Sequence, residues 1–366
     1  MSFAPDITET LARARADLRM GVPVVLCGAG HSILVLAAET LDAQRLADLR
    51  ALGGAPVLAI TSRRAETLKA MAYDGDTARV LLPPDARLAW VRGVADPADD
   101  LNTPMKGPFR CARGGDVSMH RMAITLAKTA RLLPAAVVLD LANGAQFAAD
   151  HHLTRIDAPR AAPILAATSQ LHPVVSARLP MEASEAGRLH VFRPEDGGEE
   201  HYAIEIGHPP RDRPVLARLH SACFTGDLMG SLKCDCGPQL RGALAQMGAE
   251  GAEGAGVLLY LNQEGRGIGL ANKMRAYSLQ DQGFDTVEAN HRLGFEDDER
   301  DFRLGAEILK SMGFSAVRLL TNNPNKIAMM EKAGVSVAER VPLKVGENAH
   351  NRAYLATKAA KSGHLL

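Results

Sequence analysis

Short apolar runs alternate with stretches of helical periodicity through the first half of the chain. Apolar runs bounded by polar or turn residues are typical of buried strands, whereas apolar residues spaced three and four apart are typical of helices. The pattern predicts strands at Pro23–Leu26, Ile33–Ala37, Pro56–Ile60 and Ala135–Leu141, and helices at Ala43–Leu52 and Met119–Leu133. Such alternation favours an α/β layered domain.

The second half repeats this alternation after a stretch punctuated by prolines, which places a domain boundary near Leu171–Arg188. Strands are predicted at His190–Phe192, His201–Ile206, Val215–His220, Val257–Leu261 and Ala316–Leu320, and helices at Pro238–Met247, Ala271–Gln280, Asp301–Met312 and after Pro324. The fold class predicted is α/β with two domains, 1–180 and 185–366, each a mixed sheet packed with helices.

Composition narrows the class of protein. The 366 residues are 46% hydrophobic and 23% charged, so the chain can bury enough apolar surface to fold, and disorder is excluded as its main state. Its 42 basic residues balance 42 acidic ones, which argues against a nucleic-acid or anionic-membrane binder. The first residues lack an apolar core of signal-peptide length, and no apolar run approaches the roughly 18 residues of a membrane span. We therefore expect a cytoplasmic protein.

Three of the five cysteines lie close together, at Cys223, Cys234 and Cys236. Three thiols in a C-x10-C-x-C pattern among polar residues favour a metal site over buried inert thiols. Three protein ligands with an open fourth position are typical of catalytic zinc. His220, three residues upstream, is an alternative fourth ligand that would make the site structural.

Polar clusters follow the predicted strands of the second half. Glu264-Gly265-Arg266 with further glycines comes between a strand and a helix, a geometry that suits an anion, although a glycine-rich turn with a solvated arginine is the alternative. Thr321–Lys326 is a second candidate for phosphate or a purine edge, with an ordinary helix cap as its alternative. Two further clusters are Asp285–Asn290 and Glu296–Asp301; the second is interpreted as an acidic helix start or as a setting for Arg300.

Four segments taken together resemble GTP cyclohydrolase II of riboflavin biosynthesis. They read RLHSACFTGDLMGSLKCDCG, LNQEGRGIGLANKMRAYSLQDQGFDTVEAN, LGFEDDERDF and LLTNNPNK, and the likeness runs from about Pro214 through the closing Tyr354–Leu366. The resemblance implies an enzyme that opens the imidazole ring of GTP and releases formate and pyrophosphate. The product it implies is 2,5-diamino-6-(5-phosphoribosylamino)pyrimidin-4(3H)-one.

The resemblance also implies roles for individual residues. Cys223, Cys234 and Cys236 match the ligands of one zinc ion per chain, and Mg²⁺ is implied with the triphosphate. Asp298 matches the proton acceptor, Arg300 the proposed nucleophile at the α-phosphorus, and Tyr277 the active-site tyrosine. The residues implied to contact GTP are Arg218, His220, Ser221, Gln239, Glu264, Gly265, Arg266, Thr286, Thr321 and Lys326. Because an arginine stays protonated, an equally good interpretation has Arg300 stabilising phosphate charge.

Two departures from expected patterns bear on function. Ala222 stands where the family usually has a glutamate. Residues 1–180 faintly resemble 3,4-dihydroxy-2-butanone 4-phosphate synthase, which needs carboxylates that bind Mg²⁺ just after its first strand. Here that stretch is Cys27–Ser32, which has no carboxylate, and the first one to follow is Glu39. We therefore interpret this half as a degenerate, non-catalytic domain with a structural, dimerising or regulatory role, in which His120 is a relic of the metal site or a structural histidine.

Two alternatives to a complete cyclohydrolase stay open at this point. The first is a nucleotide-binding pseudoenzyme or regulator, and the second is a variant that acts on GTP and stops at a partial reaction. Ala222 and the degenerate first half support the regulator, whereas the retained thiols, Asp298, Arg300 and Tyr277 argue against it; the presence of Tyr277 favours complete turnover. A homodimer is the expected assembly.

Overall fold

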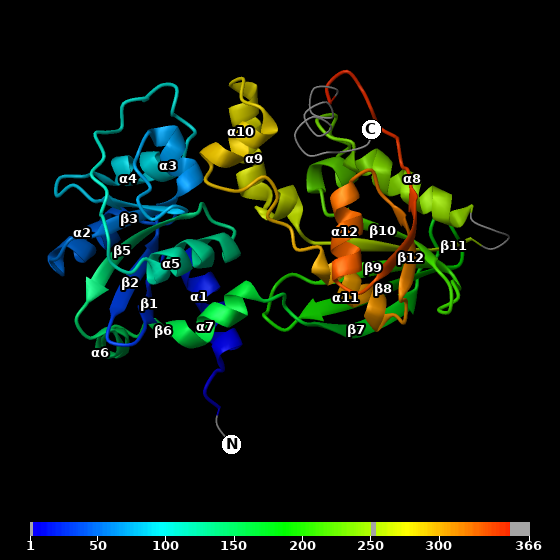
Figure 1. Cartoon of the computed structure of the whole chain (residues 1–366), viewed down its shortest axis with the longest axis horizontal. Coiled ribbons are helices and arrows are strands. Elements are labelled where there is room, and N and C mark those ends of the chain that lie inside the picture. The colour runs from blue at the N-terminus through cyan, green and yellow to red at the C-terminus, as the bar shows by residue number, and fades with distance from the viewer. Residues whose placement is uncertain (1–2, 250–253, 352–366) are drawn as a thin grey trace. The chain divides into compact units, whose positions relative to one another are not determined.

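The computed structural model describes residues 3–249 and 254–351, so the closing Tyr354–Leu366 lies outside the described residues. The chain forms two compact units. The first unit comprises Met1–Ala167 and Ile268–Glu299, and the second comprises Thr168–Gly267 and Arg300–Leu366. Each contains one sheet packed with helices (Figure 1), which confirms the predicted fold class.

A six-stranded mixed sheet forms the centre of the first unit, in the order β4-β3-β5-β2-β1-β6. Its strands are β1 (Val24–Cys27), β2 (Ser32–Ala37), β3 (Val57–Thr61), β4 (Thr77–Leu81), β5 (Ala135–Leu141) and β6 (Thr154–Asp157). β1 pairs antiparallel with β2 and parallel with β6. The four strands predicted here are present, and none is displaced by more than one residue.

Helices from two separate parts of the chain pack in this unit. From the first part come α1 (Ile7–Arg19), α2 (Ala43–Ala51), α3 (Ser62–Leu68), α4 (Leu88–Ala95), α5 (Ser118–Thr129), α6 (Gly144–Asp150) and α7 (Ala158–Ala166). From the second part come α9 (Leu270–Asp281) and α10 (Thr286–Arg292). The sequence half that resembles the cyclohydrolase therefore contributes two helices to the unit built by the other half.

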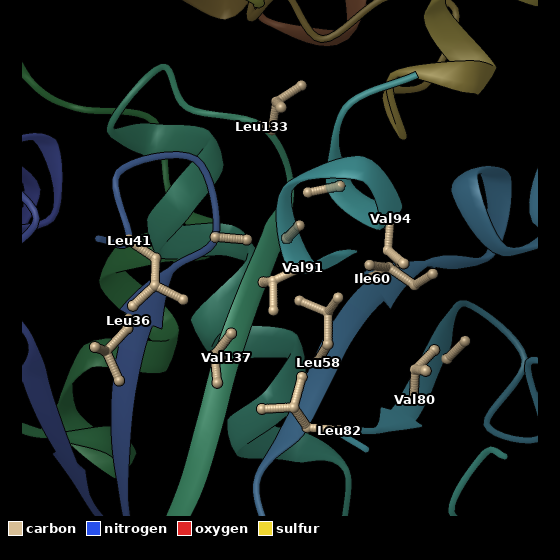
Figure 2. Close-up of a cluster of buried hydrophobic side chains, with 14 of the residues drawn as sticks. Leu36, Leu41, Leu58, Ile60, Val80, Leu82, Val91, Val94, Leu133 and Val137 are labelled. Atoms are coloured by element: carbon tan, nitrogen blue, oxygen red, sulfur yellow. The ribbon is translucent and has the colours of Figure 1, made fainter. Parts of the chain in front are cut away.

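The core of the first unit lies on both faces of its sheet, because successive side chains of a strand point to opposite faces. Val24 and Leu26 of β1 pack with α1 and α5, whereas Val25 belongs to the core on the other face. Figure 2 shows part of that other face, where Leu58 and Ile60 of β3 meet side chains of α4. Burial on both faces explains why these strands appear in the sequence as continuous apolar runs.

A seven-stranded mixed sheet forms the centre of the second unit, in the order β13-β12-β10-β11-β9-β8-β7. Its strands are β7 (Leu171–Arg178), β8 (Gly187–Pro194), β9 (His201–Gly207), β10 (Val215–Ser221), β11 (Ala255–Leu261), β12 (Ala316–Leu320) and β13 (Ser336–Val341). β10 is parallel to both of its neighbours, β11 and β12. β7 occupies part of the stretch that the proline pattern marked as a boundary.

The second unit has α8 (Cys236–Gly248), α11 (Arg303–Ser311) and α12 (Pro324–Lys332), with a π-helical turn at Phe224–Leu228 and a 3-10 turn at Glu264–Gly267. Alternate residues of β10 again divide between two cores: Ala217 and Leu219 pack with α11 and α12, and Leu216 packs with α8. None of the helices in the described ranges is long and apolar enough to cross a bilayer.

Candidate active site

The carboxyl ends of three parallel strands bring together most of the polar residues singled out in the second half. Ser221 at the end of β10 is aligned with Leu261 at the end of β11, and β12 runs parallel on the other side of β10. The chain that leaves these strands carries the thiols, the Glu264–Gly267 turn and Thr321. In open α/β sheets this edge is the usual place for a ligand.

The three thiols converge on one point. The sulfurs of Cys223, Cys234 and Cys236 all lie within 4.8 Å of one another, and those of Cys223 and Cys234 are 3.7 Å apart. Cys223 and Cys234 are buried, and Cys236 opens α8. Hydrogen bonds with the other two thiols, aided by burial, hold the pKa of Cys236 well above its ordinary value. Deprotonating this thiol therefore costs free energy. A cation that binds thiolates would offset that cost, so the donor set fits the predicted zinc ion.

Two glycines leave room for this cluster. A Cβ at Gly226 would lie 2.7 Å from the Cys234 sulfur and 3.0 Å from the Cys223 sulfur. A Cβ at Gly237 would lie 2.2 Å from the Gly226 carbonyl oxygen. Because contacts this close are not tolerated, a side chain at either position would force the ligand loop apart. The chain bends tightly here so that three sulfurs can share one centre.

Asp227 connects the thiol loop to the sheet. Its carboxylate accepts hydrogen bonds from the backbone N–H of Cys223 and from the hydroxyl of Tyr260 on β11, each at 3.0 Å. Both of its oxygens also lie 3.0 Å from Nε2 of His220. The Asp227 side chain is only 7% exposed, so these bonds operate in a desolvated setting where they fix geometry strongly.

His220 therefore contacts a carboxylate with one ring nitrogen. Among the described residues, the group of side chains close enough to share a cation contains the three thiols and not His220. Burial is the largest cause that lowers the pKa of His220, and the hydrogen bond with Asp227 opposes it. The ring also stacks on Tyr260, with centroids 5.5 Å apart. These contacts support the three-ligand alternative over a fourth histidine ligand.

The turn after β11 is built from left-handed residues. Gly265 and Arg266 have φ of 63° and 61°, and Gly267 and Gly269 also have positive φ. Glu264 accepts a hydrogen bond from the backbone N–H of Phe224 at 2.6 Å, which ties this turn to the thiol loop. A left-handed arginine is uncommon and costs backbone energy, so the conformation marks a site where the surrounding structure holds the backbone.

Two cations lie over one aromatic ring near the end of β10. Arg300 and Lys326 lie over Phe302, with 4.6 Å and 5.0 Å between charge and ring centroid. The Arg300 guanidinium donates to the Ser221 hydroxyl at 3.3 Å, and Lys326 donates to the Leu219 carbonyl at 2.9 Å. Two positive charges at the carboxyl edge make a favourable place for phosphate.

Arg218 and Gln239, both expected to contact GTP, contact each other. Arg218 is 6% exposed; it donates to Gln239 and, at 3.1 Å, to the Leu320 carbonyl. Burial lowers the pKa of its guanidinium to about 10. Its Nε has no hydrogen-bond partner among the described residues. The pair joins β10, α8 and β12.

The residues after β12 form a helix cap. The Thr321 hydroxyl accepts from the Asn323 N–H at 3.0 Å, and the Asn323 side chain accepts from the Asn325 N–H at 3.0 Å as α12 begins. Thr321 is buried. The cap alternative is therefore realised, and Lys326 in the first turn is the residue of this cluster that reaches the end of β10.

Three of the predicted site residues, Tyr277, Thr286 and Asp298, belong to the first unit. Tyr277 lies on α9 beneath the Lys273 ammonium, which is 5.6 Å from its ring centroid, and Thr286 opens α10. Asp298 is exposed in the segment that follows α10. The neighbouring Asp285 forms a capping box for α10, so this polar cluster is partly structural.

The acids of Glu296–Asp301 do not begin a helix, because α11 starts at Arg303. Four of them contact basic side chains instead: Glu296 contacts Arg63, Asp297 contacts His291, Glu299 contacts Lys128 and Asp301 contacts Arg303. The acidic helix start is realised at Asp301 alone among these contacts: its carboxylate accepts from the N–H of Arg303, the first residue of α11, at 3.0 Å. The paired acids hold the segment that carries Asp298 and Arg300.

Two residues with structural importance here carry little signal in the sequence. Asp227 was hidden inside the thiol motif, and its position four residues after Cys223 is the only signal that could have singled it out. Gln263 is 5% exposed, donates to the Asp301 carbonyl and accepts from the Asp301 N–H, both at 2.8 Å. It fastens the chain beside Arg300 to the turn after β11.

Several known proteins are similar to this chain in sequence. The sequence profile of the GTP cyclohydrolase II family matches residues 172–342. A GTP cyclohydrolase-2 of Azospirillum brasilense is 45% identical over 363 residues, which cover 97% of this chain and 93% of that protein. The chain therefore belongs to the GTP cyclohydrolase II family, a family of enzymes, and its likeness to the Azospirillum protein extends over both units.

Two further similar proteins differ in how much of this chain they match. A GTP cyclohydrolase-2 of Neisseria meningitidis is 55% identical over 196 residues, which cover 54% of this chain and 97% of that protein. Among solved structures, a two-domain 3,4-dihydroxy-2-butanone 4-phosphate synthase from A. baumannii is similar over 90% of this chain and 99% of its own. Its sequence identity is 17% and its TM-score is 0.34, too low to establish a shared fold.

Proposed function

We propose that the protein is a zinc-dependent GTP cyclohydrolase II that takes part in riboflavin biosynthesis. It hydrolyses GTP, opens the imidazole ring, and releases formate and pyrophosphate. The product is 2,5-diamino-6-(5-phosphoribosylamino)pyrimidin-4(3H)-one. The observation that carries the proposal is the convergence of three thiols at the carboxyl edge of the second sheet, beside the Glu264–Gly267 turn, in a chain of this family.

Cys223, Cys234 and Cys236 would hold one zinc ion. Bound there, zinc supplies the Lewis-acid chemistry that activates water for attack at C8 of the purine. The protein's own part is to fix the three sulfurs, which it does through the bond from the Cys223 N–H to Asp227 and through the two crowded glycines. Mg²⁺ would accompany the triphosphate.

The cations at the carboxyl edge would hold the phosphates. Arg266 in the turn after β11 and the pair Arg300 and Lys326 over Phe302 supply three positive charges within the second unit. Arg300 would stabilise charge at the α-phosphate rather than attack it, because the nitrogens of an arginine guanidinium offer no free electron pair for attack. Asp298 would accept a proton and Tyr277 would lie near the opening ring.

Arg218 and Gln239 would act differently from the other predicted contacts. Since the guanidinium of Arg218 is committed to Gln239 and to the Leu320 carbonyl, the pair would shape the floor of the site. Ser221, which accepts from Arg300, would orient that arginine. His220, Glu264, Gly265, Thr286 and Thr321 complete the proposed GTP contacts.

The first unit would not perform the synthase reaction that its sequence faintly resembles. Glu39, the first carboxylate after the Cys27–Ser32 stretch, accepts from the backbone N–H of Leu133 and pairs with Arg275, at 2.8 Å and 2.9 Å. His120 is buried, and burial is the largest cause that lowers its pKa. The full-length protein with Mg²⁺ should leave ribulose 5-phosphate unchanged; conversion detected by mass would overturn this part of the proposal.

The decisive experiment is an assay of the purified, zinc-replete full chain with GTP and Mg²⁺. Release of both formate and pyrophosphate, with the diaminopyrimidine ribose phosphate identified by mass, is the expected result. Bound but unchanged GTP would assign the protein to the nucleotide-binding regulators. A ring-opened triphosphate would make it a partial-reaction variant and would point to the environment of Ala222 and Tyr277.

A further inference from the structure

The apolar faces of α9 and α10 are part of the core of the first unit. Ala276 and Leu279 of α9 and Ala289 of α10 are at most 5% exposed, and they belong to the same buried cluster as the side chains of β3 and α4. Leu293 and Phe295, just after α10, complete this packing. The segment Ile268–Glu299 thus buries its apolar surface against residues that come from the N-terminal half of the sequence.

Arg275 joins α9 to that half by ion pairs on two sides. Its guanidinium lies 2.9 Å from a Glu39 oxygen and 3.2 Å from an Asp96 oxygen, and it donates to Asn272 at 2.7 Å. The three charged side chains are between 19% and 29% exposed, so water screens the pairs only in part. Glu39 is itself held by the Leu133 N–H, and the arginine therefore meets a fixed partner.

Backbone contacts lock the two ends of the segment. Near its start, the Asn272 amide donates to the Arg131 carbonyl at 3.1 Å. Near its end, the Thr61 hydroxyl donates to the Gly294 carbonyl at 2.8 Å. A Cβ at Gly294 would lie 2.9 Å from the Thr61 hydroxyl and 3.0 Å from Pro134, so the chain approaches as closely as a glycine allows.

A second charge cluster fixes α10. Asp100 is 8% exposed and forms ion pairs with Arg64, Lys106 and Arg292. Arg292 ends α10, and its Nη1 lies 3.4 Å from a carboxylate oxygen of Asp100. Arg292 also packs over the Phe284 ring at 3.9 Å. One buried carboxylate thus links α10 to the N-terminal half.

We propose that the N-terminal half acts as a positioning clamp for the cyclohydrolase reaction, with Arg275 as its central positioning residue. This inference rests on the proposed function. Tyr277 follows Arg275 by two residues on α9, Thr286 opens α10, and Asp298 follows the locked Gly294 by four residues. The half that has lost its own chemistry then contributes to the reaction of the other half, by fixing the backbone from which three reaction residues project.

Arg275→Met tests the clamp, with Arg79→Met as its matched control. Arg79 also forms an ion pair in the first unit, and its guanidinium bonds go to Asp74 and Gly114. Both variants lose one partly or fully buried arginine from the same unit, and only the first loses contacts made by α9. The measurements are kcat and KM for formate release, bound zinc, and amide hydrogen exchange of peptides covering α9 and α10.

The expected result is a fall in kcat of about tenfold or more for Arg275→Met, since small misplacements of reacting groups cost this much. Bound zinc should stay unchanged, and the amides of α9 and α10 should exchange faster. Arg79→Met is the control for a general loss of folding stability, and it should keep kcat within about twofold of the wild type. Arg275→Lys, which retains one ion pair, should recover part of the lost kcat.

Several outcomes would overturn the proposal. A wild-type kcat in Arg275→Met would remove the positioning role, whether or not the amides of α9 and α10 exchange faster. Equal losses in both variants would show general destabilisation and not a clamp. A wild-type chain that releases no formate would count against the proposed function instead; the exchange comparison then decides by itself whether Arg275 holds the two helices.

Discussion

His220 and Asp227 form a buried pair in which Nε2 of the imidazole lies 3.0 Å from both carboxylate oxygens. The same carboxylate accepts from the N–H of Cys223 and from Tyr260. One side chain therefore ties the ends of β10 and β11 to the first of the three thiols. If the thiols hold zinc as proposed, their affinity for it should depend on this carboxylate, which is not one of the three side chains that lie close enough to share the ion.

Replacing this carboxylate should loosen the metal loop. We expect Asp227→Ala to lower the free energy of unfolding by about 3 kcal/mol, because it leaves buried donors without an acceptor. Zinc affinity should fall at least about tenfold, as for other residues that orient ligands. Chelator competition and thermal melts measure both. Tyr260→Phe is the control: it removes one of the bonds to Asp227 and should cost only about 1 kcal/mol. Unchanged zinc affinity in Asp227→Ala would refute the linkage.

Removing one thiol should abolish the metal site. Cys234→Ser is expected to lose bound zinc and formate release together, because two thiolates and a neutral hydroxyl bind zinc far less well than three thiolates. Cys111→Ser is the matched control, since Cys111 is a half-buried thiol of the first unit outside the cluster. Metal analysis and formate assays on both variants test the assignment. Full activity of Cys234→Ser without metal would rule zinc out of the reaction.

In the first unit, the strands that the sequence locates are those buried on both faces. β1, β2, β3 and β5 form continuous apolar runs and were located to within a residue. β7 was missed because it is largely exposed and contains Pro173, so it carries no burial signal. β4 was missed because Arg79 interrupts its short apolar run; only the fold shows that Asp74 neutralises this buried arginine.

The parts of the site whose residues are close in sequence can be predicted. The contacts that depend on how distant parts of the chain pack together cannot. Three thiols within a short segment indicate a shared centre, and the structure brings their sulfurs together. Nothing local in the sequence indicates that Asp227 points back at His220, or that Arg218 donates a hydrogen bond to Gln239. The contacts of α9 with Asp96 and Glu39 join residues 179 and 236 positions apart, which periodicity cannot reveal.

Arg266 should contribute to the binding of GTP and should have no effect on how much zinc the protein holds. We expect Arg266→Asn to weaken GTP binding by about ten- to a hundredfold, the worth of a charge-assisted bond to phosphate, while bound zinc stays constant. Asparagine tolerates the left-handed conformation that Arg266 adopts, so the turn is preserved. Arg303→Ala removes an exposed arginine of the second unit, which pairs with Asp301, and serves as the charge control. Equal GTP affinity in wild type and Arg266→Asn, by calorimetry, would exclude the phosphate contact.

Asp100 should make the first unit sensitive to acid. Burial by itself would raise the pKa of Asp100, but hydrogen bonds and charge from Arg64 and Lys106 outweigh it, and the pKa lies below the ordinary 3.8. A carboxyl with a lowered folded-state pKa stabilises the folded protein, and its contribution is complete at pH values above its unfolded-state pKa. This stabilisation is lost as the pH falls through the folded-state pKa.

Asp100→Asn should therefore be less stable than wild type at neutral pH by about 3 kcal/mol, because Arg64 loses its buried counter-charge. The difference should begin to shrink as the pH falls below about 4, near the unfolded-state pKa, and should vanish below the lower folded-state pKa, where the wild-type carboxyl is protonated and resembles the amide. Asp76→Asn, which breaks the exposed pair with Arg121, should show a small difference throughout. Thermal melts across this range test the sign: a gap between wild type and Asp100→Asn that widens in acid would contradict the role given to Arg64 and Lys106.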